Sequence, residues 1–302
     1  VRDAVTISAG DAALRQSVRR VGDMMVAAIN RAAGAADTSE RGRLIVSFST
    51  KGGVGKSMVA TNLGVMLAQR SSRPVAILDG DLQFGDVAVL LGVPPQHTVV
   101  DAAAAISQGD PEIMRTLMSR HEESGLLILP APVEPSAADL VRPEEMVAIA
   151  EAMCKMCAFV VVDMPPHFDD MVLALIEAAD DVLVVASMDI PSIKNLKVGM
   201  QTLDLLSLAG PKLRLVLNRA NAKVSLEVKE VERALGIRAE FPVPSDIAVP
   251  QAVNQGVPVV LHNPKSPAAR ALEQIADAFI PKPVPEAVPT NKLSRRQKRR
   301  QG

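Results

Sequence analysis

The chain has 302 residues, of which 48% are hydrophobic and only 2% aromatic, and its formal net charge is −1 at pH 7. This length suits one large domain or two small ones, and the core must be aliphatic because the sequence contains neither Trp nor Tyr. No run is long and apolar enough for a membrane-spanning helix, no signal-peptide layout opens the chain, and two cysteines are too few for a secreted disulfide framework. We therefore expect a cytoplasmic protein.

Residues 1–41 are predicted to form an N-terminal segment made of an amphipathic helix and a linker. Apolar residues recur at helical spacing through residues 11–33, and Gly34 and the stretch after it end this pattern. We expect the helix to pack on the rest of the chain or on a second copy of it. A partner-binding helix is the alternative, and a membrane-surface helix is weaker because acids balance its few arginines.

Residues 44–57 are typical of a strand, a glycine loop and the start of a helix. The run 44–48 is apolar and β-prone, and apolar residues at helical spacing follow the loop. This arrangement binds anions, because loop N–H groups point inward and the helix dipole favours negative charge. Lys56 would reach the β- and γ-phosphates of a nucleotide, and the Ser57 hydroxyl would bind Mg²⁺. The residues expected to wrap the phosphates are Gly52, Gly53, Val54 and Gly55.

The loop departs from the pattern G-x-x-x-x-G-K-[ST], because Thr50 stands at the first glycine position. The segment from Lys51 to Ser57 instead resembles the deviant phosphate loop of the ParA/MinD family of ATPases. The resemblance implies that Lys51 crosses a dimer interface to touch the partner subunit's nucleotide, and that Lys51 and Lys56 act in catalysis. Met58 replaces a hydroxyl residue that the family usually has near the α-phosphate, a departure that bears on nucleotide affinity.

Strands and helices alternate through residues 42–280, which we predict to be one P-loop ATPase domain. Most strand candidates are continuous Val, Leu and Ile runs, as expected of parallel strands covered on both faces. The predicted fold class is α/β, a doubly wound and mostly parallel sheet with helices on both faces and the ligand at the strands' carboxyl ends. The predicted strands are 44–49, 75–78, 126–129, 159–162, 182–186, 213–217 and 239–241. The predicted helices include 143–157, 168–179, 192–208, 224–235 and 266–280.

Carboxylates stand where two of these strands end. Asp79 and Asp81 follow one strand, and Asp163 follows another. Carboxylates at such positions can hold metal-bound water and lie close to Mg²⁺. The segment from Asp79 to Gln83 also resembles the family's D-x-D-x-Q sequence. This resemblance implies that Asp81 positions the hydrolytic water and that Asp79 is an outer-shell Mg²⁺ partner. The Pro165-Pro166 pair resembles the family's second switch, which responds to the γ-phosphate.

The base-binding residues are implied by the resemblance alone. By the family's pattern, Asn218 reads the adenine edge and the backbone from Pro244 to Asp246 closes over the base. The implied set is Asn218, Arg219, Pro244, Ser245 and Asp246. This set favours ATP over GTP, because a GTP-binding relative would be expected to have a specificity Asp in the segment around Asn218.

Cys154 and Cys157 form a C-x-x-C pair, and some relatives of this family carry an Fe–S cluster between subunits on such a pair. No second pair or nearby His completes a zinc site here. We interpret the two cysteines as small apolar residues on a packed helix, with an Fe–S carrier as the alternative.

The C-terminal segment 281–302 holds seven Lys and Arg against one Glu, which leaves a charge of −7 on the rest of the chain. A Pro-rich stretch at 281–289 predicts a stiff spacer, and the basic tail that follows is predicted to be disordered. Residues 292–300 are expected to add affinity for anionic lipid or nucleic acid. A solvated tail without a function is the alternative.

Longer stretches resemble one branch of the family. Residues 78–86, 162–170, 189–195 and 216–220 look like the CpaE/TadZ branch, whose members localise assembly of Flp/Tad-type pili at the inner face of the cell membrane, often at a pole. The resemblance implies a homodimer that sandwiches two ATP molecules with Mg²⁺, hydrolyses them slowly and recruits pilus-assembly components. The alternatives are a ParA-type partitioning ATPase that binds DNA non-specifically and a MinD-like division regulator. We rank the MinD-like role lower because such proteins end in an amphipathic membrane helix, whereas this sequence ends in the Pro-rich stretch and the basic tail.

Overall fold

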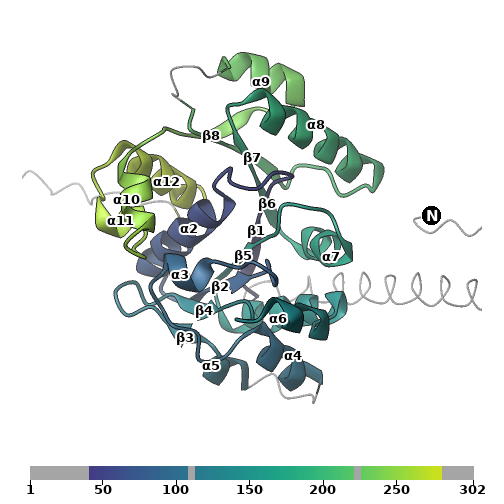
Figure 1. Ribbon diagram of the computed structural model, residues 1–302, viewed down its shortest axis with the longest axis vertical. Coiled ribbons are helices and arrows are strands. Elements are labelled where there is room, and N and C mark those ends of the chain that lie inside the picture. Colours follow the sequence, from purple (N-terminus) through teal and green to yellow (C-terminus); the bar gives the residue numbers. More distant parts are fainter. Residues whose placement is uncertain (1–40, 108–112, 221–225, 281–302) are drawn as a thin grey trace, which may run out of the picture.

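The computed structural model describes residues 41–107, 113–220 and 226–280. Both the predicted helix at 11–33 and the predicted tail at 281–302 lie outside these residues. Eight strands form one sheet in the order β3-β4-β2-β5-β1-β6-β7-β8 (Figure 1). All neighbouring strands are parallel except β3 and β4. The strands are β1 (Arg43–Phe48), β2 (Val75–Asp79), β3 (Ser119–Arg120), β4 (Leu127–Leu129), β5 (Phe159–Asp163), β6 (Asp181–Ser187), β7 (Leu213–Asn218) and β8 (Ala239–Val243).

The seven predicted strands are all present, and the mostly parallel, doubly wound sheet is confirmed. The prediction missed β3, because a strand of two polar residues has no apolar run to reveal it. The helices predicted at 143–157, 168–179 and 266–280 correspond to α6 (Pro143–Met156), α7 (Asp170–Ala178) and α12 (Pro267–Asp277). The helices predicted at 192–208 and 224–235 correspond to α8 (Ile190–Leu205) and α9 (Val228–Leu235).

Side chains of each central strand point alternately into two helical layers. In β1, Leu44, Val46 and Phe48 pack in one buried cluster, and Ile45 packs in the other. The first layer holds α6 to α9 together with α4 (Val99–Ser107), α5 (Met114–Leu117) and the 3₁₀ helix η3 (Pro135–Leu140). The second holds α12 together with α2 (Lys56–Arg70), α3 (Val87–Leu90), α10 (Ala248–Val253) and α11 (Val259–His262).

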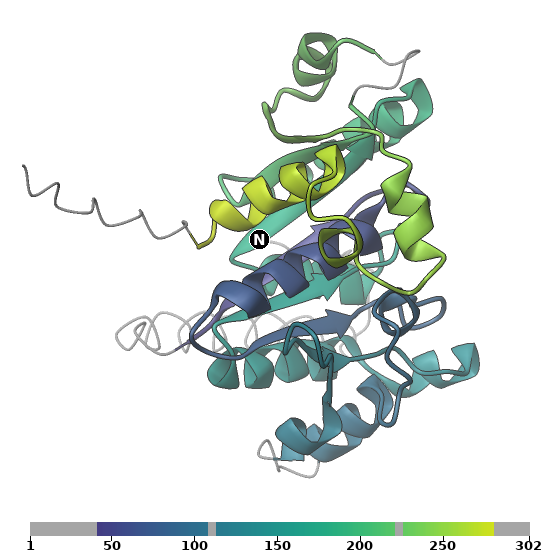
Figure 2. The same cartoon turned by 90° about the vertical axis from the view of Figure 1, so that its left-hand side faces the viewer.

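One edge of the sheet collects the carboxyl ends of the parallel strands. In Figure 2 the arrowheads of these strands point to the right, and the same edge faces the reader in Figure 1. The loop between β1 and α2 lies at the middle of this edge because β1 lies between β5 and β6. Segments that follow β2, β5, β7 and β8 therefore surround the glycine loop.

Cys154 and Cys157 are buried in the first layer's core, at the end of α6. Burial raises the pKa of the two thiols to about 12 and about 11. This packing supports the interpretation of the pair as core residues. Among the described residues, no helix has both the length and the apolarity needed to cross a bilayer.

Candidate nucleotide-binding site

The glycine loop turns sharply into α2. Gly53 and Gly55 have φ angles of 73° and 104°, which only glycine adopts freely, and Gly55 is the N-cap residue of the helix. A Cβ on Gly55 would also lie 2.3 Å from the Asn218 amide nitrogen. No acidic residue stands in the first turn of α2. The helix N-terminus is therefore open to an anion.

Lys56 is held beneath this loop and is only 7% exposed. Its carbonyl accepts a hydrogen bond from the buried Ser47 hydroxyl at 3.2 Å. Burial lowers the pKa of Lys56, while the charges of Asp163 and Asp81 act in the opposite direction. The lysine charge is thus placed between the loop and two carboxylates, where a phosphate would meet it.

Asp163, at the end of β5, is the most exceptional polar group of the site. Neither of its buried carboxylate oxygens has a hydrogen-bond partner among the described residues. Burial raises its pKa to about 7, although two groups act to lower it: the Ser57 hydroxyl, which approaches the carboxylate without completing a hydrogen bond, and the charge of Lys56. A buried carboxylate without partners carries a large desolvation cost, which a bound cation would offset. Asp163 and Ser57 together therefore fit Mg²⁺, which prefers oxygen ligands.

Asp79 is equally buried but has backbone partners. Its two oxygens accept hydrogen bonds from the N–H groups of Asp81, at 3.2 Å, and Val87, at 3.1 Å. Burial and the neighbouring Asp163 raise its pKa well above the ordinary value. A Cβ on Gly85 would lie 2.4 Å from an Asp79 oxygen. Asp79 therefore organises the loop 80–87, and the outer-shell Mg²⁺ role stays a prediction.

Asp81 lies at the start of that loop and is partly exposed. Its carboxylate accepts a hydrogen bond from the Phe84 N–H at 3.2 Å, and it lines a hollow of about 400 Å³ together with Pro165 and His167. The segments that follow β2 and β5 thus line one hollow beside the glycine loop, and the switch role of Pro165-Pro166 stays a prediction. Among the described residues, no three Asp, Glu, His or Cys side chains are grouped so that they could hold a metal ion.

Lys51 has a partner that the sequence analysis did not identify. Its Nζ lies 2.9 Å from Asp189 Oδ1. Asp189 is the N-cap residue of α8 and also accepts hydrogen bonds from the Ser192 N–H and the Ser187 hydroxyl. Burial acts to raise the pKa of Asp189, but these hydrogen bonds and Lys51 lower it overall. In the sequence, only the segment Asp-Ile-Pro at 189–191, which is typical of a helix start, indicated that Asp189 could be an N-cap residue.

The residues implied for the base line one cavity of about 540 Å³ next to the loop. The cavity brings Gly55 and Met58 together with the segments that follow β7 and β8. From the predicted set it contains Asn218, Arg219, Pro244, Ser245 and Asp246. Sequence analysis missed the other lining residues, which are Ile247, Val249, Pro250, Val253 and Asn254.

Two of these polar residues already bond to the protein. The Asn218 amide donates to the Val54 carbonyl at 2.8 Å and accepts from the Arg219 N–H at 2.9 Å. Asp246 accepts from the N–H groups of Ala248 and Ala268 and so fastens α10 to α12. Asn218 therefore ties the end of β7 to the phosphate loop, in addition to any contact with a base.

Comparisons with known proteins agree with this geometry. An uncharacterized ATP-binding protein of Methanocaldococcus jannaschii is 29% identical over 238 residues, covering 78% of this chain and 87% of the relative. The structure of a ParA family ATPase from Chlorobium tepidum has a TM-score of 0.71 at 23% identity and covers 79% of this chain and 98% of that one. The septum site-determining protein MinD of Pyrococcus horikoshii, solved with Mg-ADP, has a TM-score of 0.69 at 22% identity and covers 79% and 96%.

At these low identities, the two solved structures bear on the fold alone. The sequence model described as the CobQ/CobB/MinD/ParA nucleotide binding domain matches residues 45–259, which is most of the chain. That range holds the glycine loop, the carboxylates at the ends of β2 and β5, and the base cavity. The protein belongs to the CobQ/CobB/MinD/ParA family of nucleotide-binding domains.

Proposed function

We propose that the protein is an ATP-dependent switch that dimerises with ATP·Mg²⁺ and hydrolyses ATP slowly to ADP and phosphate. The observation that carries this is the buried, unpartnered carboxylate of Asp163 beside Lys56 and Ser57. A protein tolerates such a group where a ligand completes it. Membership of the family and the ATP-binding relative support the same conclusion.

The roles follow from the positions of the side chains. The loop Gly52 to Gly55 and the N-terminus of α2 would bind the phosphates, while Lys56 balances their charge. Ser57 and Asp163 would hold Mg²⁺, which neutralises phosphate charge when bound. Asp81 would orient the attacking water from the loop that Asp79 fixes. Lys51 would leave Asp189 and reach the nucleotide of a second copy.

We assign this switch to residues 42–280, flanked by the segments 1–41 and 281–302. Its cellular role is to position or regulate a cell-envelope machine, for which the Flp/Tad pilus is our first candidate. The support is the resemblance of residues 78–86, 162–170 and 189–195 to the CpaE/TadZ branch. The protein would act in the cytoplasm, peripherally at the inner face of the membrane. Residues 292–300 would add weak affinity for anionic lipid.

A MinD-like role in division-site placement is the second candidate. The family description names MinD, and a solved MinD shares the fold over 79% of this chain. A ParA-type role, in which the tail binds DNA, is the third. The three candidate roles differ in what the ATP-bound protein binds, which is assembly proteins, a membrane or DNA, so binding experiments can separate them.

The switch is tested by light scattering of the full chain in ATP·Mg²⁺ and in ADP·Mg²⁺, with calorimetry of ATP binding. We expect an ATP-dependent dimer that Lys51→Ala loses and Asp81→Ala retains, with phosphate release abolished in Asp81→Ala. A chain that fails to bind ATP would overturn the proposal. The role is tested by binding of the ATP form to Flp/Tad assembly proteins, to vesicles with and without anionic lipid, and to duplex DNA. Salt-sensitive DNA binding that disappears when residues 290–302 are removed would favour partitioning over the pilus.

A further inference from the structure

The outer face of α8 exposes apolar and basic side chains together. Ile190, Val198 and Leu205 are each more than half exposed, and Leu205 reaches 86%. The exposed Lys194 and Lys197 lie between them. Spacings of four, seven and eight residues place all five on one side of a helix. We call these five residues the basic stripe.

A second exposed surface is apolar and acidic. Phe84, in the loop after β2, and Val133 and Leu140, in and before η3, are each more than half exposed. Glu134 and Asp139 are exposed next to them in the sequence. We call these five residues the acidic rim. Exposed apolar groups of this size normally mark a binding surface when they gather in one place.

Asp139 of the acidic rim lines a hollow of about 400 Å³ between the loops that follow β2 and β5, and so do Gln83 and Val141, the sequence neighbours of Phe84 and Leu140. Its walls combine apolar side chains with carboxylates, including Leu82, Val141, Met171, Asp81, Asp139 and Asp170. The two basic groups that line it already have acidic partners, since Arg142 pairs with Glu145 and His167 with Asp169. A lysine suits such a hollow, because its methylenes cover apolar surface while its ammonium meets carboxylates.

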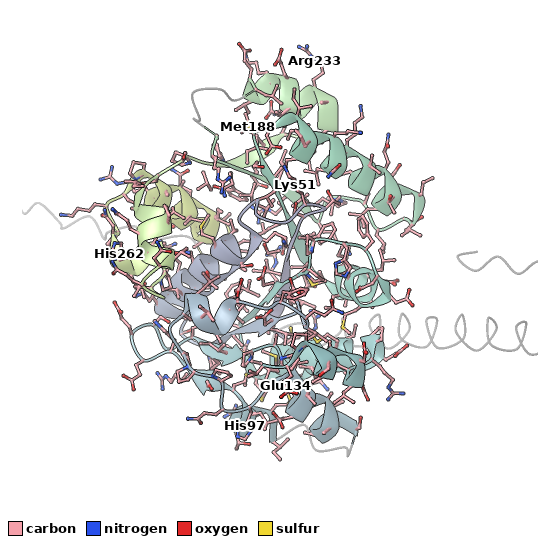
Figure 3. All side chains as sticks on the ribbon, viewed as in Figure 1. Lys51, His97, Glu134, Met188, Arg233 and His262 are labelled. Carbon is pink, nitrogen blue, oxygen red and sulfur yellow. The ribbon has the colours of Figure 1, made fainter. Side chains whose placement is uncertain are left out.

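The basic stripe and the acidic rim lie at the same edge of the sheet, on opposite sides of Lys51. Figures 1 and 3 share one view, with this edge toward the reader. In it α8, which Figure 1 labels, lies above and to the right of Lys51, and Glu134 lies below Lys51, as Figure 3 labels them. Two copies that meet face to face around a two-fold axis can pair each surface with itself or with the other one. Pairing α8 with α8 would bring four lysines together, whereas pairing stripe with rim joins opposite charges.

We propose that the basic stripe of α8 binds the acidic rim of a second copy of this chain, so that each dimer contains this contact twice. The proposal rests on the proposed function, because it specifies the surfaces that bring Lys51 to the partner's nucleotide. The proposed contact fixes the orientation of the two-fold axis, because α8 of one copy must lie over the loops that follow β2 and β4 of the other. The self-complementary charges of one chain favour a second copy over an unrelated partner.

The inner side of α8 connects this surface to the phosphate loop. Gly199 approaches the loop so closely that a Cβ there would lie 2.3 Å from Thr50 Cγ2 and 3.4 Å from the Phe168 ring. Phe168 in turn packs on Phe48 of β1, with ring centroids 4.9 Å apart. At its N-cap, α8 also holds Lys51 through Asp189. Movement of the loop or of the segment after β5 would therefore displace the basic stripe.

The test uses charge reversal on the full chain with a non-hydrolysable ATP analogue and Mg²⁺. The stripe variant is K194E/K197E, the rim variant is E134K/D139K, and the control K155E/R238E reverses two exposed charges next to the amino ends of β5 and β8. Each of the first two should weaken the dimer by about tenfold or more, because opposed charges become like charges in both contacts. An equal mixture of the stripe and rim variants should restore the dimer, since one contact is then native and the other has both charges exchanged.

Light scattering gives the dimer fraction, and calorimetry gives ATP binding for every variant. A dimer that neither reversal weakens overturns the docking proposal, as does a loss that the mixture fails to restore or that the control shares. A wild type that binds ATP yet stays monomeric overturns the docking proposal and leaves the nucleotide site intact. If wild type does not bind ATP, the proposed function fails. The docking proposal then stands or falls on whether the mixture, without nucleotide, associates more than either variant alone.

Discussion

At the phosphate end of the site, Lys56, Asp79 and Asp163 are buried ionisable groups, and Asp163 has no hydrogen-bond partner among the described residues. At the base end, Asn218 and Asp246 already bond to backbone groups of the protein. The phosphate end is therefore electrostatically incomplete without a ligand, whereas the base end keeps its shape by itself. For the proposed switch, we therefore expect phosphates and metal to supply most of the free energy of ligand binding and the base cavity to contribute shape complementarity.

The largest effect is expected from Asp163→Asn, at the phosphate end of the site. ATP turnover should fall by about 100-fold because a Mg²⁺ ligand is lost. Without nucleotide, however, the variant should be more stable than wild type at pH 8, by about 4 kcal/mol, because a buried charge has been removed. Denaturant unfolding and phosphate release measure the two effects.

The same variant predicts a pH dependence. The pKa of Asp163 is about 7 in the folded protein and about 4 in an unfolded chain, so the folded state binds the extra proton between these values. The stability of wild type relative to Asp163→Asn should therefore fall as pH rises from about 4 to about 7. The two proteins should be equally stable near the lower limit, where Asp163 is neutral. If the difference in free energy of unfolding between the two proteins stays constant over this pH range, the raised pKa does not belong to Asp163.

Asn218→Ala tests whether the base end also supports the phosphate loop. The change leaves the Val54 carbonyl without its partner, so ATP affinity should fall by about tenfold. A loop-positioning role predicts the same loss for GTP and for inorganic tripolyphosphate, which has no base. Calorimetry with the three ligands decides the matter. A loss confined to ATP would show that Asn218 acts by reading adenine.

Gly85→Ala affects the loop that Asp79 holds. The added Cβ would lie 2.4 Å from an Asp79 oxygen and 2.6 Å from Ala131 Cβ, so the loop and Asp81 must shift. We expect ATP turnover to fall by about fivefold with little change in ATP affinity, because misplacement of a positioning group costs rate more than binding. An unchanged turnover would mean that the loop tolerates this shift.

Asp189→Asn should have the smallest effect. Asn is as good an N-cap residue as Asp, so α8 should persist, but Lys51 loses its charged partner. Freed from this contact, Lys51 should support an ATP-dependent dimer at about threefold lower protein concentration, because a partly exposed ion pair contributes little.

The matched control is Glu230→Gln, which likewise removes one carboxylate charge, from an exposed residue of α9 outside the basic stripe. A second readout is the reactivity of Lys51 toward an amine-specific reagent, measured by mass spectrometry without nucleotide. It should rise in Asp189→Asn and stay unchanged in Glu230→Gln.

How far the sequence predicted the fold depended on local apolar patterns. Continuous Val, Leu and Ile runs identified seven strands, because strands covered on both faces leave little room for polar residues. The two-residue β3 has no such pattern, and α8 begins two residues earlier than predicted because Asp189 caps it. Of the residues that line the base cavity, Ile247, Val249 and Val253 gave no signal, since apolar residues in a helix or loop are read as core.

The phosphate loop and the carboxylates beside it could be predicted from the amino-acid sequence without a structure. A glycine loop between a strand and a helix is a local feature, and parallel strands necessarily bring their carboxyl ends to one edge. The tertiary structure was needed to find the partners of Lys51 and Asn218, because Asp189 and Val54 lie 138 and 164 residues away along the chain. It also decided that the basic stripe and the acidic rim lie on opposite sides of Lys51. Such relations depend on how the helices pack around the sheet, which no spacing along the chain records.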